Sequence, residues 1–208
     1  VGVFNPALTV LICTDLLQTL DSANMRSGYA EMLKHGLISD VSHWAELLRF
    51  DLSSIDYRQL QDLVAHSVSI KESFVKKDPY EHDIRKALNL GHTVGHAFES
   101  LALATGQPVL HGYAVAWGCI NELYLSAMKV HFPSNKMHQT VQFIKDNYGK
   151  MEITCKQYDT LYEYMTHDKK NISGVINFTL LSEIGEIRIN QTATKEEIFE
   201  MLDFYREC

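Results

Sequence analysis

Residues 89–96 read NLGHTVGH, and residues 110–112 read LHG. They bring three histidines, His92, His96 and His111, into a short part of the chain. Positions four residues apart lie on one face of a helix, so the side chains of His92 and His96 would point the same way. Imidazole is the commonest nitrogen ligand of a divalent metal, and the two segments therefore indicate a metal site.

Such a site also needs an acidic partner, and the best candidate lies upstream. Residues 27–36 read SGYAEMLKHG and contain Glu31. Gly91 and Gly95 flank the first histidine in what reads as a helix, at a cost of about 1 kcal/mol each relative to alanine. Either a backbone, cofactor or substrate comes close there, or two helices pack tightly against each other.

Composition limits the kind of protein. The 208 residues suffice for one good core, or for one domain with an appendage. A formal net charge of -7 argues against nucleic acid as a partner. No apolar run is long enough to span a membrane, and no N-terminal signal segment supports secretion. The four cysteines form no C-x-x-C pair, which favours reduced thiols in the cytoplasm. Because the chain begins with Val1, we expect an excised fragment.

Apolar periodicity and capping residues predict a mainly α-helical chain. Thr194 and Glu197 form a capping box that would open the last helix. A short strand is expected at residues 9–13 and a β-hairpin at 175–181 and 187–189. The other predicted helices run from Asp21 or Ser22 to Gly36, around residues 44–48, from 60 to 74, from 91 to about 103, and from 113 to about 130, with a break at Pro79 and a turn at 105–108.

In chain order, the segments at residues 27–36, 89–96 and 110–112 resemble three motifs of the 3-dehydroquinate synthase family: S-G-x-A-E-x-x-K-x-G, N-[LF]-G-H-[ST]-x-G-H and L-H-G. The resemblance runs from about residue 9 to the end of the chain. It implies a multihelical C-terminal domain of the dehydroquinate synthase-like fold with a small β-hairpin. The family also has an N-terminal NAD-binding domain, and no glycine-rich fingerprint here replaces it. We therefore expect residues 1–20 to hold a remnant strand and connection from that missing domain, and residues 21–208 to form the helical metal- and substrate-binding domain.

The resemblance assigns the metal ligands to Glu31, His92 and His111, and gives His96 a contact with substrate. Two neutral imidazoles and one carboxylate leave a zinc ion with net positive charge, which suits a Lewis acid. A metalloprotease pair of His92 and His96 is disfavoured, because that motif needs a glutamate where Thr93 stands. One departure from the family is residue 113, a tyrosine where L-H-G-E is frequent, which makes the local hydrogen bonding uncertain.

The family's substrate is an anionic sugar phosphate with a carboxylate, so a chain of net negative charge needs a local group of cations. Here, too, the resemblance supplies the residues. Lys71 and Arg85 would hold the carboxylate, while Asn89, His96 and a late lysine would hold the phosphate. The full set comprises Lys34, Lys71 and His96 as catalytic residues, and Glu81, Arg85, Asn89 and either Lys169 or Lys170 as substrate-binding residues.

Through this resemblance the sequence implies a lyase of the shikimate pathway of aromatic amino acid biosynthesis. The reaction cyclises 3-deoxy-D-arabino-heptulosonate 7-phosphate to 3-dehydroquinate with release of phosphate. The implied cofactors are Zn²⁺, for which Co²⁺ could substitute, and NAD⁺, which would be held by the missing domain. We expect the 208-residue chain alone to be inactive. The family is commonly dimeric, which favours a homodimer.

Three alternatives stay open. Another sugar phosphate cyclase would share the fold, zinc and NAD, but it would alter substrate-facing residues that this chain keeps, namely Arg85, Asn89 and His96. A metal-dependent polyol or alcohol dehydrogenase tends to have aspartate in place of Glu31 and needs fewer cations. A non-catalytic metal-binding interaction domain would bind no phosphate sugar.

Overall fold

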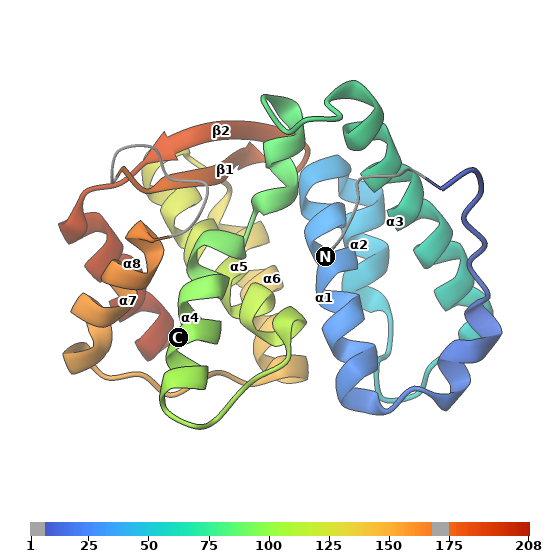
Figure 1. Ribbon diagram of the computed structural model, residues 1–208, viewed down its shortest axis with the longest axis horizontal. Helices are drawn as coiled ribbons and strands as arrows, with labels where there is room; N and C mark the ends of the chain where they lie inside the picture. Colours follow the sequence, from blue (N-terminus) through green and yellow to red (C-terminus); the bar gives the residue numbers. More distant parts are fainter. Residues whose placement is uncertain (1–6, 168–174) are drawn as a thin grey trace.

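The computed structural model describes residues 7–167 and 175–208. In these ranges the chain forms eight α-helices and one antiparallel two-stranded sheet (Figure 1). The helices are α1 (Ser22–Ser39), α2 (Val41–Arg49), α3 (Tyr57–Lys77), α4 (His92–Ala104), α5 (His111–Val130), α6 (Ser134–Tyr148), α7 (Tyr158–Thr166) and α8 (Lys195–Glu207). The strands are β1 (Asn177–Glu183) and β2 (Glu186–Thr192), and the 3₁₀ turns are η1 (Thr14–Thr19), η2 (Ile84–Asn89) and η3 (Cys155–Gln157). The predicted mainly α-helical fold with a small hairpin is confirmed.

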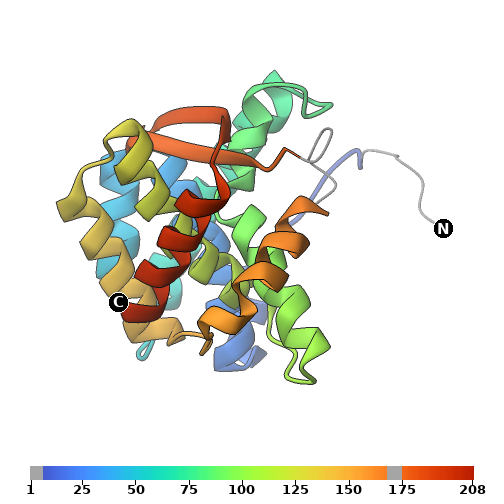
Figure 2. The same cartoon turned by 90° about the vertical axis from the view of Figure 1, so that its left-hand side faces the viewer.

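Helix α5 lies at the centre of the molecule. It contacts α1, α4, α6, α8 and strand β1, and most of its residues are buried because apolar side chains occur on every face. Figure 1 shows α1, α2 and α3 together on one side of it and α7 and α8 on the other. In Figure 2 the hairpin crosses one end of the helices, above α8. The predicted helix from residue 113 is therefore correct in kind, but it begins two residues earlier, at His111.

Helix ends follow the side chains that cap them. Asp21 accepts hydrogen bonds from the backbone N–H groups of Ala23 and Asn24, both at 3.0 Å, so α1 begins where the sequence predicted. Thr194 and Glu197 form the expected reciprocal capping box at the start of α8. These ends could be predicted because the interacting groups are only a few residues apart.

Two predictions about backbone structure are wrong. Helix α1 does not end at Gly36 but continues to Ser39. A Cβ atom at position 36 would lie 2.7 Å from Cδ1 of Leu47, so this glycine lets α2 pack against the last turn of α1. Residues 9–13 form no strand and are exposed. A strand needs a neighbour for its backbone hydrogen bonds, and in the described ranges the only sheet pairs β1 with β2.

Helices α6 and α7 were not identified from the sequence, although α6 carries a readable signal. Apolar side chains recur at helical spacing at Met137, Val141, Ile144 and Tyr148, and all are buried against the core.

Among the described residues, no helix combines the length and apolar character that crossing a membrane would require.

Candidate metal centre

The three ligands expected from the motifs meet in space, although they come from three different helices. Glu31 lies in α1, His92 is the first residue of α4, and His111 is the first residue of α5. The Oε1 atom of Glu31 lies 3.4 Å from Nε2 of His92 and 3.5 Å from Nε2 of His111. Two ligand atoms that are each about 2.1 Å from a tetrahedral zinc ion lie about 3.4 Å apart. This donor set and its spacing therefore fit a divalent metal such as zinc.

A buried carboxylate from α5 fixes the start of α4 and thereby His92. The side chain of Glu122, which is fully buried, accepts hydrogen bonds from the backbone N–H groups of Gly91 at 2.7 Å, Thr93 at 3.1 Å and Val94 at 3.3 Å. The first N–H groups of a helix have no partners within the helix, and the helix dipole attracts a negative charge there. Glu122 thus caps α4 from a neighbouring helix and holds the backbone on both sides of His92.

The glycines around His92 allow α4 and α5 to approach closely. Gly91 is the N-cap of α4 and not part of its interior, and its φ of 78° is in the left-handed region that favours glycine. A Cβ at position 91 would lie 2.5 Å from Sγ of Cys119, and one at Gly95 would lie 3.0 Å from the carbonyl oxygen of Ala114. Of the two explanations offered by the sequence, the structure thus supports tight helix–helix packing.

A second close contact places His111 opposite Glu31. The backbone N–H of Gly112 donates to Oγ of Ser27 at 3.0 Å. A Cβ at position 112 would overlap the carbonyl oxygen of Ser27, so any larger residue would push α5 away from α1. Because Glu31 is one turn further along α1 than Ser27, this contact sets the distance between the carboxylate and the His111 ring.

The second nitrogen of each ligand histidine faces an acceptor. Nδ1 of His92 lies 3.1 Å from the carbonyl oxygen of Leu90, and Nδ1 of His111 lies 3.1 Å from Oε2 of Glu99. When Nδ1 carries the proton and donates to these oxygens, Nε2 of each ring is left free for a metal. The sequence analysis did not identify Glu99, although an acidic residue one turn after His96 was a usable signal.

The charges around Glu31 keep it ionised. Burial alone would raise its pKa, but hydrogen bonds from His111 and His92 and the charge of Lys34 outweigh this effect and lower it. The ammonium of Lys34 lies 2.5 Å from Oε2, so one carboxylate oxygen faces a buried lysine and the other faces the histidines. Burial lowers the pKa of His92, which favours the neutral imidazole that a metal requires.

A cavity of about 400 Å³ opens beside this centre. It is lined by Glu31, Lys34, His35, Lys71, Glu81, Arg85, Leu88, Asn89, His92 and His111. The structure thus brings eight of the predicted site residues to one cavity, with the cations Lys34, Lys71 and Arg85 next to the metal ligands. An anionic ligand would find both positive side chains and a metal position in the same space.

Hydrogen bonds to the loop between α3 and η2 fix the positions of Arg85 and Asn89, which lie on η2. The carboxylate of Asp78 accepts hydrogen bonds from the backbone N–H groups of residues 82, 83 and 85. The Nη1 atom of Arg85 donates to the carbonyl oxygen of Pro79 at 2.5 Å, and Nδ2 of Asn89 donates to Oε1 of Glu81 at 2.7 Å. These bonds organise the side chains before any ligand arrives, which lowers the entropy lost on binding.

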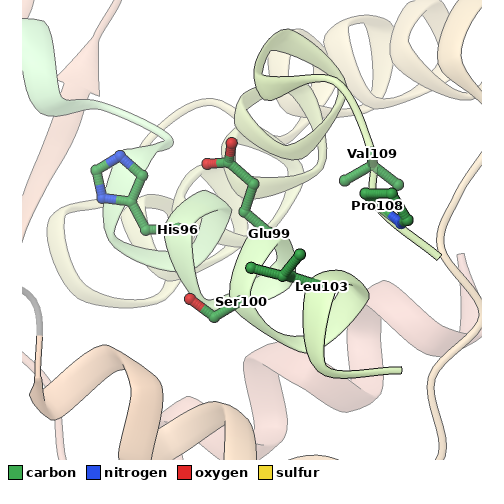
Figure 3. A pocket seen from close by; sticks show the side chains of 6 residues that line it. All are labelled: His96, Glu99, Ser100, Leu103, Pro108 and Val109. Atoms are coloured by element: carbon green, nitrogen blue, oxygen red, sulfur yellow. The ribbon is translucent and has the colours of Figure 1, made fainter. Parts of the chain in front are cut away.

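The remaining predicted residues, His96, Lys169 and Lys170, are not among the described residues that line this cavity. His96 lines a neighbouring cavity of about 410 Å³, and Figure 3 shows its ring and the Glu99 carboxylate extending to the same side of α4. The ring centre of His96 is 5.4 Å from that of His92 and 5.8 Å from that of His111. The substrate contact expected of His96 stays a prediction. Lys169 and Lys170 lie outside the described residues.

Two further residues lie at positions next to the predicted site residues His111 and Lys34. Tyr113, which replaces the frequent glutamate, contacts the rings of Trp117 and Tyr148. His35 was missed, although it follows Lys34 in the same motif and lines the cavity. Its Nδ1 lies 2.6 Å from Oγ of Ser67, and its Nε2 is buried with no hydrogen-bond partner in the part of the chain that the structure describes. Burial lowers the pKa of His35 to about 3.

The known proteins that are similar to this chain belong to the family expected from the motifs. The family model described as "3-dehydroquinate synthase C-terminal" matches residues 28–171. A 3-dehydroquinate synthase of Parabacteroides distasonis is 55% identical over 207 residues, which are 100% of this chain and 59% of that protein. One from Oceanobacillus iheyensis is 34% identical and is matched over 98% of this chain and 57% of its own length. The chain thus spans less than two thirds of the relatives it matches.

Solved structures show the same fold. A 2-epi-5-epi-valiolone synthase from Streptomyces hygroscopicus subsp. jinggangensis with NAD⁺ and Zn²⁺ bound superposes with a TM-score of 0.84 at 21% identity, over 100% of this chain and 58% of that one. A 2-deoxy-scyllo-inosose synthase complexed with carbaglucose-6-phosphate, NAD⁺ and Co²⁺ superposes with a TM-score of 0.73 at 25% identity, over 93% of this chain and 54% of that one. From the matched family model and the identity to its members, we conclude that the chain belongs to the 3-dehydroquinate synthase family and corresponds to its C-terminal region.

Proposed function

We propose that this chain is the metal- and substrate-binding part of a 3-dehydroquinate synthase. The full protein would convert 3-deoxy-D-arabino-heptulosonate 7-phosphate to 3-dehydroquinate and release phosphate, with NAD⁺ held by a region outside these 208 residues. The observation that carries the proposal is the cavity in which Glu31, His92 and His111 lie beside three cationic side chains. A dianionic phosphate and a carboxylate on one small substrate call for this combination.

In this proposal, different side chains in and near the cavity bind the carboxylate and the phosphate of the substrate. The planar guanidinium of Arg85 and the ammonium of Lys71 would bind the carboxylate, since a guanidinium fork matches carboxylate geometry. Asn89, His96 and a lysine of the pair Lys169 and Lys170 would bind the phosphate, whose own oxygen can accept a proton as it leaves. A divalent metal at the three ligands would supply Lewis-acid polarisation of substrate oxygens. Positioning and electrostatics would then account for much of the rate enhancement.

Lys34 has a separate role in this proposal. Its ammonium is buried and ion-paired with Oε2 of Glu31, so it keeps the carboxylate ionised and aimed at the metal position. Lys34 also lines the cavity, where its remaining N–H groups would donate to substrate oxygens. The residue would therefore both position a ligand and contact the substrate.

The N-terminal segment supports a connection to a further domain. Leu8, Leu11 and Leu16 are well exposed in this chain. Apolar side chains of this size gain free energy when a partner surface covers them. We propose that the predicted connection at residues 1–20, of which 7–20 are described, leads to the NAD-binding domain, and that the chain alone completes no turnover. The four cysteines are free, which supports a cytoplasmic location.

A second candidate is another sugar phosphate cyclase, because the two structural neighbours named above carry such names. The higher identity to a 3-dehydroquinate synthase favours the first candidate. Phosphate release from the heptulosonate phosphate, compared with binding of carbaglucose-6-phosphate, distinguishes the two.

The decisive experiment replaces His92 with alanine in the full-length protein. Metal content by elemental analysis and phosphate release should both be lost, since one of three ligands is removed. The matched control is His138→Ala, which changes an exposed helical histidine on α6 and should leave both unchanged. A His92→Ala protein that keeps its metal and its activity would refute the assignment.

A further inference from the structure

A second cluster of metal-binding side chains lies between α2 and α3. His43 and Glu46 are one turn apart on α2, and His66 lies on α3. One ligand atom from each comes within 4.8 Å of the other two. The cluster shares no residue with the centre formed by Glu31, His92 and His111. Nothing in the proposed catalytic reaction uses it.

His43 makes this cluster unusual. Its side chain is fully buried, and neither ring nitrogen has a hydrogen-bond partner among the described residues. Buried polar groups in folded proteins are nearly always paired, so two orphan nitrogens on one ring need an explanation. The centroid of the His43 ring lies 4.0 Å from the centroid of the His66 ring, with an angle of 38° between the ring planes. Nδ1 of His43 lies 3.9 Å from Oε2 of Glu46.

The acidic groups lie too far away to satisfy the rings by themselves. The 3.9 Å from Nδ1 of His43 to Glu46 exceeds hydrogen-bond length, and so does the 3.9 Å from Nε2 of His66 to Oδ2 of Asp40. The other oxygen of Asp40 caps α2 by accepting from the backbone N–H of His43 at 2.9 Å. Two carboxylates therefore stand beside two imidazoles with a gap in each pair.

An ion in the gap would bind one ring nitrogen of His43 together with Glu46 and His66. Ligand atoms around a tetrahedral zinc ion are about 3.4 Å apart, whereas the ligand atoms of these three residues lie within 4.8 Å of one another and Nδ1 of His43 lies 3.9 Å from Oε2 of Glu46, so the side chains must move closer to hold an ion. Glu46 and His66 are half exposed and can rotate inward, while His43 is already held by the core. Burial and the neighbouring His66 lower the pKa of His43, so its ring is neutral and offers a lone pair at neutral pH.

We propose that His43, Glu46 and His66 bind a divalent transition metal ion, of which Zn²⁺ best fits two imidazoles and a carboxylate. The ion joins α2 to α3, two helices that both pack against α1 (Figure 1). Asp40, whose Oδ2 lies 3.9 Å from Nε2 of His66, could supply an oxygen as a fourth ligand or orient the ring of His66. The site is structural, because it lies on helices that brace the metal-bearing α1 and not in the substrate cavity.

The test isolates this site by removing the other. The 208-residue chain carrying His92→Ala and His111→Ala serves as the background, and the probe is Co²⁺ followed by visible absorption, with Zn²⁺ counted by elemental analysis. The proposal expects one ion per background chain. Adding His66→Ala or Glu46→Gln, both at exposed positions, should weaken its binding at least tenfold. His138→Ala in the same background is the matched control and should leave binding unchanged.

Either of two results would overturn the proposal. One is a background chain that binds no Co²⁺ or Zn²⁺. The other is a background chain whose single ion binds equally well after His66→Ala and after Glu46→Gln. Far-UV circular dichroism on each variant shows that the helices persist. Since the background lacks the proposed catalytic ligands, the result does not depend on whether the proposed function is correct.

Discussion

Replacing Glu122 with glutamine removes the charge that caps α4 and keeps the size of the side chain. In the native protein one carboxylate oxygen accepts from the N–H groups of Thr93 and Val94, and the other accepts from that of Gly91. Glutamine keeps only one accepting oxygen, and its NH₂ group would face at least one backbone donor. Losing one or two charge-assisted hydrogen bonds at about 1.5–3 kcal/mol each, plus the helix-dipole interaction, predicts a loss of about 3–5 kcal/mol in unfolding free energy.

The assay is urea unfolding of the metal-free chain at pH 7, followed by circular dichroism. The matched control is Glu200→Gln, which changes an exposed carboxylate that accepts from the hydroxyl of Tyr124, and it should cost less than about 0.5 kcal/mol. Because the cap also fixes His92, zinc affinity measured against a chelator should fall about 10–100-fold. A Glu122→Gln chain that loses less than about 1 kcal/mol and binds zinc normally would refute the reasoning.

Three other predictions concern the same region. Burial lowers the pKa of His35 to about 3, so as the pH falls below about 6.5 only the unfolded chain takes up this proton. The native chain should therefore lose about 2 kcal/mol more than His35→Gln between pH 7 and pH 5, measured by urea unfolding, and equal losses would contradict this. Gly112→Ala should destabilise the folded chain by more than about 2 kcal/mol, because its Cβ would meet the backbone of Ser27. Gly28→Ala, where a Cβ meets open space inside a helix, should stabilise the chain by about 1 kcal/mol. Thermal unfolding of the two variants measures this difference, and equal effects would contradict the packing argument. Glu99→Gln should weaken zinc binding about 10–100-fold, because the partner of His111 Nδ1 loses its charge, and unchanged affinity in a chelator competition would exclude that role.

Local interactions were predictable from the sequence, and interactions between distant segments were not. Thr194 with Glu197 and the cap at Asp21 were correct because each cap spans only a few residues. Gly36 satisfied the local rule for a helix end, but packing against α2 overrode that rule. The strand expected at residues 9–13 failed because strand structure depends on a partner, which no local pattern reveals.

The candidate site divides in the same way. Spacing alone suggested His92 and His96 as a pair, yet the structure brings His92 and His111 to Glu31, as the family resemblance implied. The supporting residue Glu122 lies on another helix from the backbone groups it holds, and its role is visible only in three dimensions. A sequence pattern can name the groups that a reaction needs, but it does not show what keeps them in place.

Helix α5 carries both a candidate metal ligand, His111, and the cap of the neighbouring helix, Glu122. They stand about three turns apart, so both side chains return to the face that looks toward α4. Inserting or deleting one residue between them would rotate one against the other by about 100° and shift it by about 1.5 Å. Changes in the length of this stretch would therefore be selected against. Insertions and deletions in relatives of this chain should be confined to the loops on either side of α5.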